Sequence, residues 1–324
     1  MKQHIKISKS RLIASLCVAA CLLLLQATVY AQDSTAAKKT NESSKKDKPV
    51  KNTFASPLLI DDQTVIVPSK GSFEFIMQHR FGSVQNGVKD LWGMYGISDI
   101  RLGASYAPIN NLYLSTGITK TKMLWDGSAK YSIIKQTTHK IPVSVTYYGN
   151  MAYDTREDPN KVLFTYGTQR LSYFNEIMVA RKVTDKLSVQ VAGSISHQNS
   201  VNGYYTVYDS TTKTVFKDQK FDMFAFSVCI RYKLTATTSF IIDYDQPLTK
   251  QPTNNPSPNL AFGFEFNTSG HTFQFFAANY TALNPQQNMM YNTNSPFGYT
   301  QTNGTKMPGG EYVIGFNITR LWNF

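Results

Sequence analysis

The amino-acid sequence predicts an all-β protein, an antiparallel transmembrane β-barrel of the outer-membrane type with about twelve strands. Three observations support this prediction. From residue 71 onward, segments of about ten residues alternate apolar side chains with small or polar ones, which is the pattern of strands with two different faces. The connections between these segments alternate between short polar turns and long loops. The chain ends in an alternating strand that finishes on an aromatic residue.

The first 52 residues are predicted to be an export signal and a tether. Residues 1–31 combine a basic start, an apolar core at 12–25 and small residues around Ala31, as cleaved secretory signal peptides do. An uncleaved anchor helix and lipidation at Cys21 are the alternatives. Residues 32–52 are rich in Lys and Ser and contain no aromatic side chain, which predicts a flexible linker. Export by a cleaved signal indicates the bacterial outer membrane as the destination of the barrel.

Composition excludes two classes of protein. The mean hydropathy of −0.28 is too low for a bundle of membrane-spanning helices, because each of these needs about 20 nearly uncharged residues. The net charge is +12, but residues 1–52 hold more than half of the basic excess, so nucleic acid is not an expected partner.

Two of the three cysteines lie in the predicted signal, which leaves Cys229 as the single thiol and allows no internal disulfide.

The barrel is predicted to occupy residues 71–324, preceded by a periplasmic N-terminal segment at 53–70. About ten residues tilted by about 40° span the roughly 25 Å apolar band of an outer membrane. A soluble β-sandwich is the structural alternative, and aromatic residues near strand ends, such as Trp125 and Trp322, favour the barrel. The predicted strands lie at 71–81, 98–107, 111–120, 125–135, 141–151, 170–181, 187–197, 221–233, 238–245, 259–267, 271–280 and 311–324.

The last predicted strand has the most specific local pattern. Its alternate positions are apolar or aromatic, with Arg320 as the exception. Such a terminal row is the kind of membrane-insertion signal that the outer-membrane assembly machinery reads, so that machinery is an expected partner during biogenesis. The residues of this insertion signal are Tyr312, Ile314, Phe316, Ile318, Trp322 and Phe324.

A set of short motifs is distinctive when taken together. They are QHRFG at 78–82, DLWG at 90–93, SDIRLG at 98–103, WDG at 125–127 and VARK at 179–182. The set resembles a family of bacterial outer-membrane β-barrel proteins whose function is not defined, over roughly residues 55–324. The resemblance implies a barrel in the outer membrane, and it supplies no catalytic residue.

The polar faces of the strands predict a lumen with balanced charge. Acidic and basic residues occur there in similar numbers, whereas an ion-selective pore is expected to carry a ring of one sign. These groups either pair across the lumen and make the barrel rigid or line a path for an uncharged or zwitterionic solute. The best candidate for such a paired lumen cluster consists of Glu74, Arg80, Asp99 and Arg101.

The leading functional hypothesis is a monomeric outer-membrane channel or transporter for a small polar solute, embedded in outer-membrane lipid. Loops 198–220 and 281–310 are expected to control access to its lumen, and residues 204–216 are expected to form a small hairpin outside the membrane. The alternative is a binding or structural barrel whose lumen is filled by its own side chains. No catalytic constellation, cofactor motif or metal-ligand spacing is found, so no enzyme is predicted.

Overall fold

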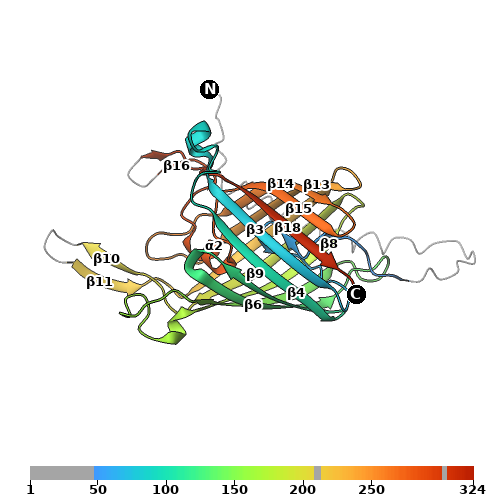
Figure 1. The fold of residues 1–324 in the computed structure, drawn as a ribbon, viewed down its shortest axis with the longest axis horizontal. Helices are drawn as coiled ribbons and strands as arrows, with labels where there is room; N and C mark the ends of the chain where they lie inside the picture. Colours follow the sequence, from blue (N-terminus) through green and yellow to red (C-terminus); the bar gives the residue numbers. More distant parts are fainter. Residues whose placement is uncertain (1–46, 208–212, 301–304) are drawn as a thin grey trace, which may run out of the picture.

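The predicted fold class is confirmed. A computed structural model describes residues 47–207, 213–300 and 305–324, and in it the strands close into one antiparallel barrel (Figure 1). The predicted signal peptide at 1–31 and the first part of the linker lie outside the described residues. Within the described part of the chain, no helix has the length and apolar character needed to cross a bilayer.

The barrel wall consists of twelve strands, and all twelve predicted segments are present with somewhat different bounds. Consecutive wall strands are neighbours, and the last strand closes the barrel by pairing with the first. The wall strands are β3 (Phe73–Ser83), β4 (Asp99–Ile109), β5 (Leu112–Thr119), β6 (Leu124–Ile134), β7 (Ser144–Asp154), β8 (Leu171–Lys182), β9 (Leu187–Gln198), β12 (Asp222–Lys233), β13 (Thr238–Pro247), β14 (Asn259–Asn267), β15 (His271–Ala278) and β18 (Val313–Trp322).

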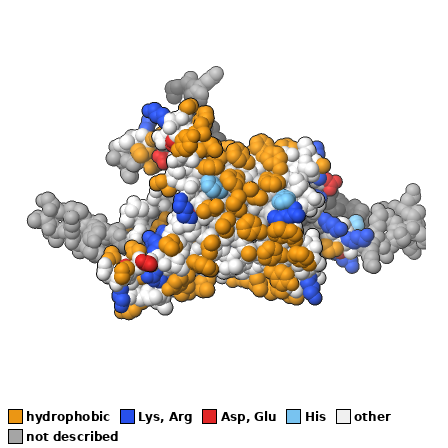
Figure 2. Space-filling view, in the orientation of Figure 1, with side chains coloured by type: hydrophobic (Ala, Val, Ile, Leu, Met, Phe, Trp, Pro, Cys, Tyr) orange, Lys and Arg blue, Asp and Glu red, His pale blue; other side chains and the backbone are white. Residues whose placement is uncertain are grey.

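Alternation sorts the side chains between the outside and the lumen. In β14, Phe262, Phe264 and Phe266 are exposed on the outside, whereas Ala261 and Glu265 are buried on the inside. Hydrophobic side chains cover much of the wall in the space-filling view, and most of the Lys, Arg, Asp and Glu side chains visible there lie toward its two ends (Figure 2). The wall therefore presents an apolar band to the lipid, as the alternation predicts.

The shorter turns gather at one end of the barrel and the longer connections at the other, where the four-residue 120–123 connection is the exception. The short turns lie at 110–111, 135–143, 183–186, 234–237 and 268–270, and the opposite end carries the connections 84–98, 120–123, 155–170, 199–221, 248–258 and 279–312. The predicted hairpin in the 199–221 loop is present. The remaining elements of this end are η1 (Val84–Asp90), η2 (Thr121–Met123), η3 (Gly167–Arg170), β10 (Gly203–Val207), β11 (Lys213–Asp218), α2 (Pro285–Tyr291), β16 (Tyr299–Thr300) and β17 (Lys306–Met307).

The segment before the first wall strand enters the lumen, where the sequence predicts a periplasmic segment. It forms a small hairpin of its own, β1 (Leu58–Leu59) and β2 (Asp62–Gln63), which does not join the barrel sheet. Leu59 and Ile60 are fully buried. We call residues 54–66 the plug segment. Inside the barrel its apolar side chains are buried from water, whereas in the periplasm they would be exposed to it.

We expect Phe264→Arg to destabilise the folded barrel in a bilayer by about 2–4 kcal/mol, because an arginine near the middle of the lipid-facing band loses its hydration. Phe264 lies in register with Phe240 on one side and Phe275 on the other, within an outward aromatic row. The matched control is Phe266→Arg on the same strand, one residue from its end, for which about 0–1 kcal/mol is expected. Reversible unfolding from lipid vesicles measures both, and equal values would contradict the assigned membrane position.

Candidate functional site: a lumen closed by the plug segment

Side chains of the barrel wall hold the backbone of the plug segment. Gln190 and Gln274 each bond it twice, once as donor and once as acceptor. A buried backbone that does not join the barrel sheet needs such partners for the groups that its own hairpin leaves unpaired. The contacts of Gln274 are with Ile60 N–H at 3.0 Å and Leu58 C=O at 3.0 Å, and those of Gln190 are with Val65 N–H at 3.0 Å and Gln63 C=O at 2.7 Å. Single further bonds run from Asn317 Nδ2 to Ile60 C=O at 2.6 Å and from Lys130 Nζ to Pro57 C=O at 2.8 Å.

The lumen also contains an apolar core, which the strand pattern does not predict. Inward-facing apolar residues of the wall pack with the plug segment from one side and with α2 from the other. The alternation rule assigns faces but does not require the inner face to be polar, because a filled lumen can bury apolar groups there. The main members of this core are Leu59, Ile60, Val65, Phe174, Met178, Met223, Ile241, Phe276, Met289 and Met290.

The predicted lumen cluster faces inward, but its four members bond to other residues rather than to one another. Arg80 is the member that contacts the plug segment. Its guanidinium donates to Asp61 Oδ1 at 2.7 Å and to Asn317 Oδ1 at 3.1 Å. Because Arg80 is 0% exposed, its pairing with Asp61 is a buried, charge-assisted contact that fixes the hairpin inside the barrel. Asp61 was missed as a partner because it lies outside the predicted strands.

The other three members of the predicted lumen cluster bond within the wall or at its rim. Arg101 forms a two-point ion pair with Asp126, at 2.6 and 2.8 Å. Glu74 accepts a hydrogen bond from the Tyr113 hydroxyl. Asp99 accepts from a backbone N–H of the 120–123 connection at 3.0 Å. The four residues thus point inward without pairing with one another, and their partners lie on the plug segment, on strands β5 and β6 and in the 120–123 connection.

Acidic side chains gather where the plug segment meets strands β12 and β13. Cys229 Sγ donates to Asp62 Oδ2 at 3.3 Å, and the hydroxyl of Tyr280 donates to Asp243 Oδ2 at 3.2 Å. Burial, with the nearby carboxylates of Asp243 and Asp245, raises the pKa of Asp62 well above its ordinary value. Burial and the Asp243 carboxylate likewise raise the pKa of Tyr280. Burial and like-charge repulsion therefore work against ionisation of Asp62 in this part of the lumen.

Three cavities border the plug segment or α2, inside the barrel and at its two ends. An internal one of about 40 Å³, on the order of three water molecules, lies between the plug segment, the wall and the start of α2. A vestibule of about 300 Å³ opens at the short-turn end, where Asn52, Glu74, Arg231 and Lys233 line it. A second vestibule of about 630 Å³ opens at the loop end, where Asp90, Asp99, Asn279 and Glu311 are among its lining residues. The plug segment and α2 lie between the two vestibules.

A closed barrel with an apolar outer band is the architecture of a membrane-spanning β-barrel protein. The chain belongs to the family described as membrane bound beta barrel domain (DUF5777), whose sequence profile matches residues 54–322. This confirms the family membership that the motifs indicate. The matched region begins at Phe54, so it includes the plug segment together with the twelve wall strands.

Several solved barrels share the general architecture at low identity. The NanC porin is 10% identical, with 78% of this chain and 99% of that one covered at a TM-score of 0.43. The KdgM porin is 10% identical over 78% and 99% of the two chains, with a TM-score of 0.41. An outer membrane channel from Pseudomonas putida F1 is 9% identical over 79% and 97%, with a TM-score of 0.47. No curated protein matches the chain in sequence.

We expect Asp61→Ala to loosen the plug segment by about 3–5 kcal/mol, because it leaves the buried Arg80 guanidinium without its carboxylate. Hydrogen exchange of the Ile60 and Val65 amides reports this free energy directly, since both amides donate to wall side chains. The control is Arg156→Ala, which breaks an ion pair with Asp154 near the loop end, outside the plug segment. Unchanged protection of the two amides in Asp61→Ala would show that the pair does not anchor the plug segment.

Proposed function

We propose that this protein is an outer-membrane channel for a small polar solute, closed in the described state by its own plug segment. The observation that carries the proposal is the arrangement of two vestibules at opposite ends of one barrel. Glu74 lines the first and Gly82 the second, and these residues lie near opposite ends of β3. The segments that separate the vestibules are not part of the barrel sheet.

The contacts that hold the plug segment in the lumen can be replaced by contacts with water. The plug segment is held by side-chain hydrogen bonds, one buried ion pair and apolar packing, and it forms no strand pairing with the wall. An ordinary protein hydrogen bond contributes about 0.5–1.5 kcal/mol net, because water replaces it when it opens. The plug segment can therefore leave the lumen without breaking the wall, whose backbone bonds stay closed.

The charges of the lumen favour an uncharged or zwitterionic solute. Arg101 pairs with Asp126, and Arg231 pairs with Glu265 at 2.7 Å. In each pair the positive and the negative charge neutralise each other, so these residues do not contribute to a ring of one sign that would select ions. A solute that carries both hydrogen-bond donors and acceptors matches this lining.

A second closing element lies at the loop end and supports the predicted role of loop 281–310. Within this loop, α2 extends into the lumen and buries Met289 and Met290. Gln286 Nε2 donates to Asn150 Oδ1 of β7 at 2.8 Å, which fixes α2 to the wall. Access from this end thus depends on a loop element, whereas access from the short-turn end depends on the plug segment.

The route by which the protein reaches its membrane is part of the proposed function. Residues 1–31 act as a cleaved export signal, and the terminal row acts as the signal for the assembly machinery. The outward placement of Ile314, Phe316, Ile318 and Trp322 on β18 supports this role. The closed wall, whose strands all find partners within one chain, supports a monomer.

Deletion of residues 54–66 tests the channel. In planar bilayers and in liposome swelling with small sugars and amino acids, we expect the deleted protein to show persistent solute flux and the full-length protein to stay mostly closed. The matched control removes residues 203–218, a hairpin that forms its own sheet apart from the wall. We expect it to behave as the full-length protein does, which would exclude this hairpin from the access control predicted for loop 198–220. A correctly folded deletion variant without flux would exclude the channel and favour the structural or binding barrel.

A further inference from the structure

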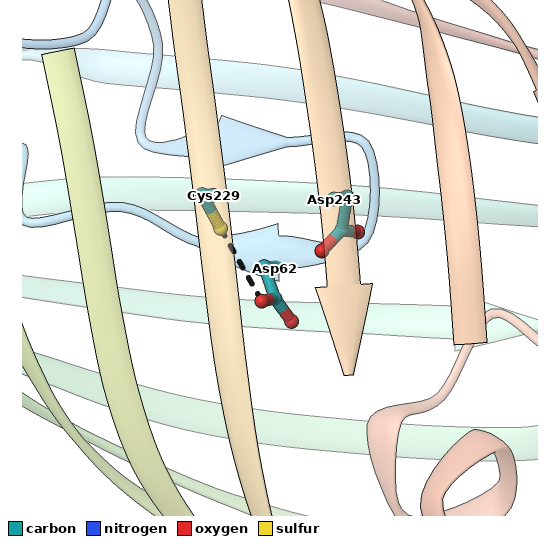
Figure 3. A group of neighbouring side chains, drawn as sticks. All are labelled: Asp62, Cys229 and Asp243. Carbon is teal, nitrogen blue, oxygen red and sulfur yellow. Dashed lines mark hydrogen bonds between the residues drawn. The ribbon is translucent and has the colours of Figure 1, made fainter. Parts of the chain in front are cut away.

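Three side chains of metal-binding type meet where the plug segment touches the wall. Asp62 comes from β2, Cys229 from β12 and Asp243 from β13, and Figure 3 shows the carboxyl groups and the thiol lying close together. Their candidate ligand atoms all lie within 4.8 Å of one another. Cys229 and Asp243 face each other across the β12–β13 pair, and Asp62 lies 167 and 181 positions before them, so the entry of the plug segment into the lumen adds the third residue.

Three buried carboxylate oxygens around this group have no hydrogen-bond donor. Asp243 Oδ1 is buried without a partner, and so are both carboxylate oxygens of Glu176, a residue that is 2% exposed. Glu176 and Asp62 line the same internal cavity. The neighbouring Asp245 differs, because Ser227 and Asn259 donate to its two oxygens at 2.6 and 3.0 Å. Unpaired carboxylates of this kind destabilise a fold unless a cation or a proton compensates them.

The basic side chains of the lumen are engaged elsewhere. Arg80 pairs with Asp61, Arg101 with Asp126 and Arg231 with Glu265. Lys130 Nζ donates to a plug carbonyl. Over the part of the chain that the structure describes, Asp62, Asp243 and Glu176 form no ion pair with Lys, Arg or His. The Lys130 charge attracts the Glu176 carboxylate, so a bound cation or a proton is the remaining compensation for Asp62 and Asp243.

We propose that Asp62, Cys229 and Asp243 bind a divalent transition-metal ion of the zinc type, with a water molecule from the neighbouring cavity as the fourth ligand. Cysteine sulfur favours zinc over magnesium and calcium, which prefer oxygen ligands only. Zn–S and Zn–O bonds of about 2.3 and 2.0 Å at a tetrahedral angle place the ligand atoms about 3.5 Å apart. The Sγ–Oδ2 distance of 3.3 Å is close to this value. Cys229 binds as the thiolate and releases its proton to water.

Such an ion joins the plug segment to two strands of the wall. One protein ligand lies on the hairpin, and the other two lie on β12 and β13. Tyr280 and Gln190 supply outer contacts, since the first donates to Asp243 and the second lies 3.9 Å from the Cys229 sulfur. Metal binding is thus expected to stabilise the plugged state, whatever solute the barrel admits.

Titration of the metal-free mature protein in detergent with Co²⁺ tests the site. We expect one Co²⁺ per chain, a near-ultraviolet thiolate-to-cobalt charge-transfer band, and displacement by Zn²⁺. Cys229→Ser should abolish the band, and Asp62→Asn should weaken binding more than about tenfold, because losing a ligand costs at least as much as losing an outer contact. Asp62→Asn changes only the plug segment, so it keeps the test valid if a wall variant fails to fold.

The matched control is Asp245→Asn, which removes a neighbouring buried charge whose oxygens already have donors. It should retain the charge-transfer band and bind Co²⁺ within a few-fold of the unchanged protein. Absence of stoichiometric binding to the unchanged protein would overturn the proposal. Equal binding by Cys229→Ser would also overturn it, as would a loss of affinity in Asp245→Asn as large as that in Asp62→Asn.

Discussion

The structure depends on one constraint, that every backbone N–H and C=O group within a bilayer needs a partner inside the protein. Closure of β18 onto β3 meets this requirement for all twelve strands and leaves the wall without a free edge. The plug segment is subject to the same requirement inside the lumen, but it has no strand to pair with beyond its own hairpin. Amide side chains such as Gln190 and Gln274 therefore supply its partners.

Charge is concentrated inside the barrel because the outer face has to be apolar. The lumen brings acids and bases from distant strands together, and most find partners, as Arg80 does with Asp61. The acids around Asp62 are the exception, since their surroundings provide few donors. The same filled interior thus contains both the side-chain contacts that hold the plug segment and the carboxylate oxygens that lack a donor.

The fold was largely predictable, and the site was predictable only in part. Alternation along each segment gave the wall strands and the facing of Glu74, Arg80, Asp99 and Arg101, since facing depends only on neighbouring positions. Their pairing was not predictable, because it depends on the register between strands and on what fills the lumen. One feature of the sequence could have indicated the plug segment. Leu58, Leu59 and Ile60 form an apolar run before the first wall strand, and such a run is unfavourable in a segment exposed to the periplasm.

The sequence by itself determined that this chain is a membrane barrel of about twelve strands with an apolar outside, because a period of two is a local property of the chain. The tertiary structure alone decided that the lumen is closed, that Asp61 partners Arg80, and that Asp62, Cys229 and Asp243 meet. Asp61 and Asp62 are far in sequence from Asn317, Cys229 and Asp243 of the wall, and the folding of the barrel around the plug segment is the physical event that brings them together.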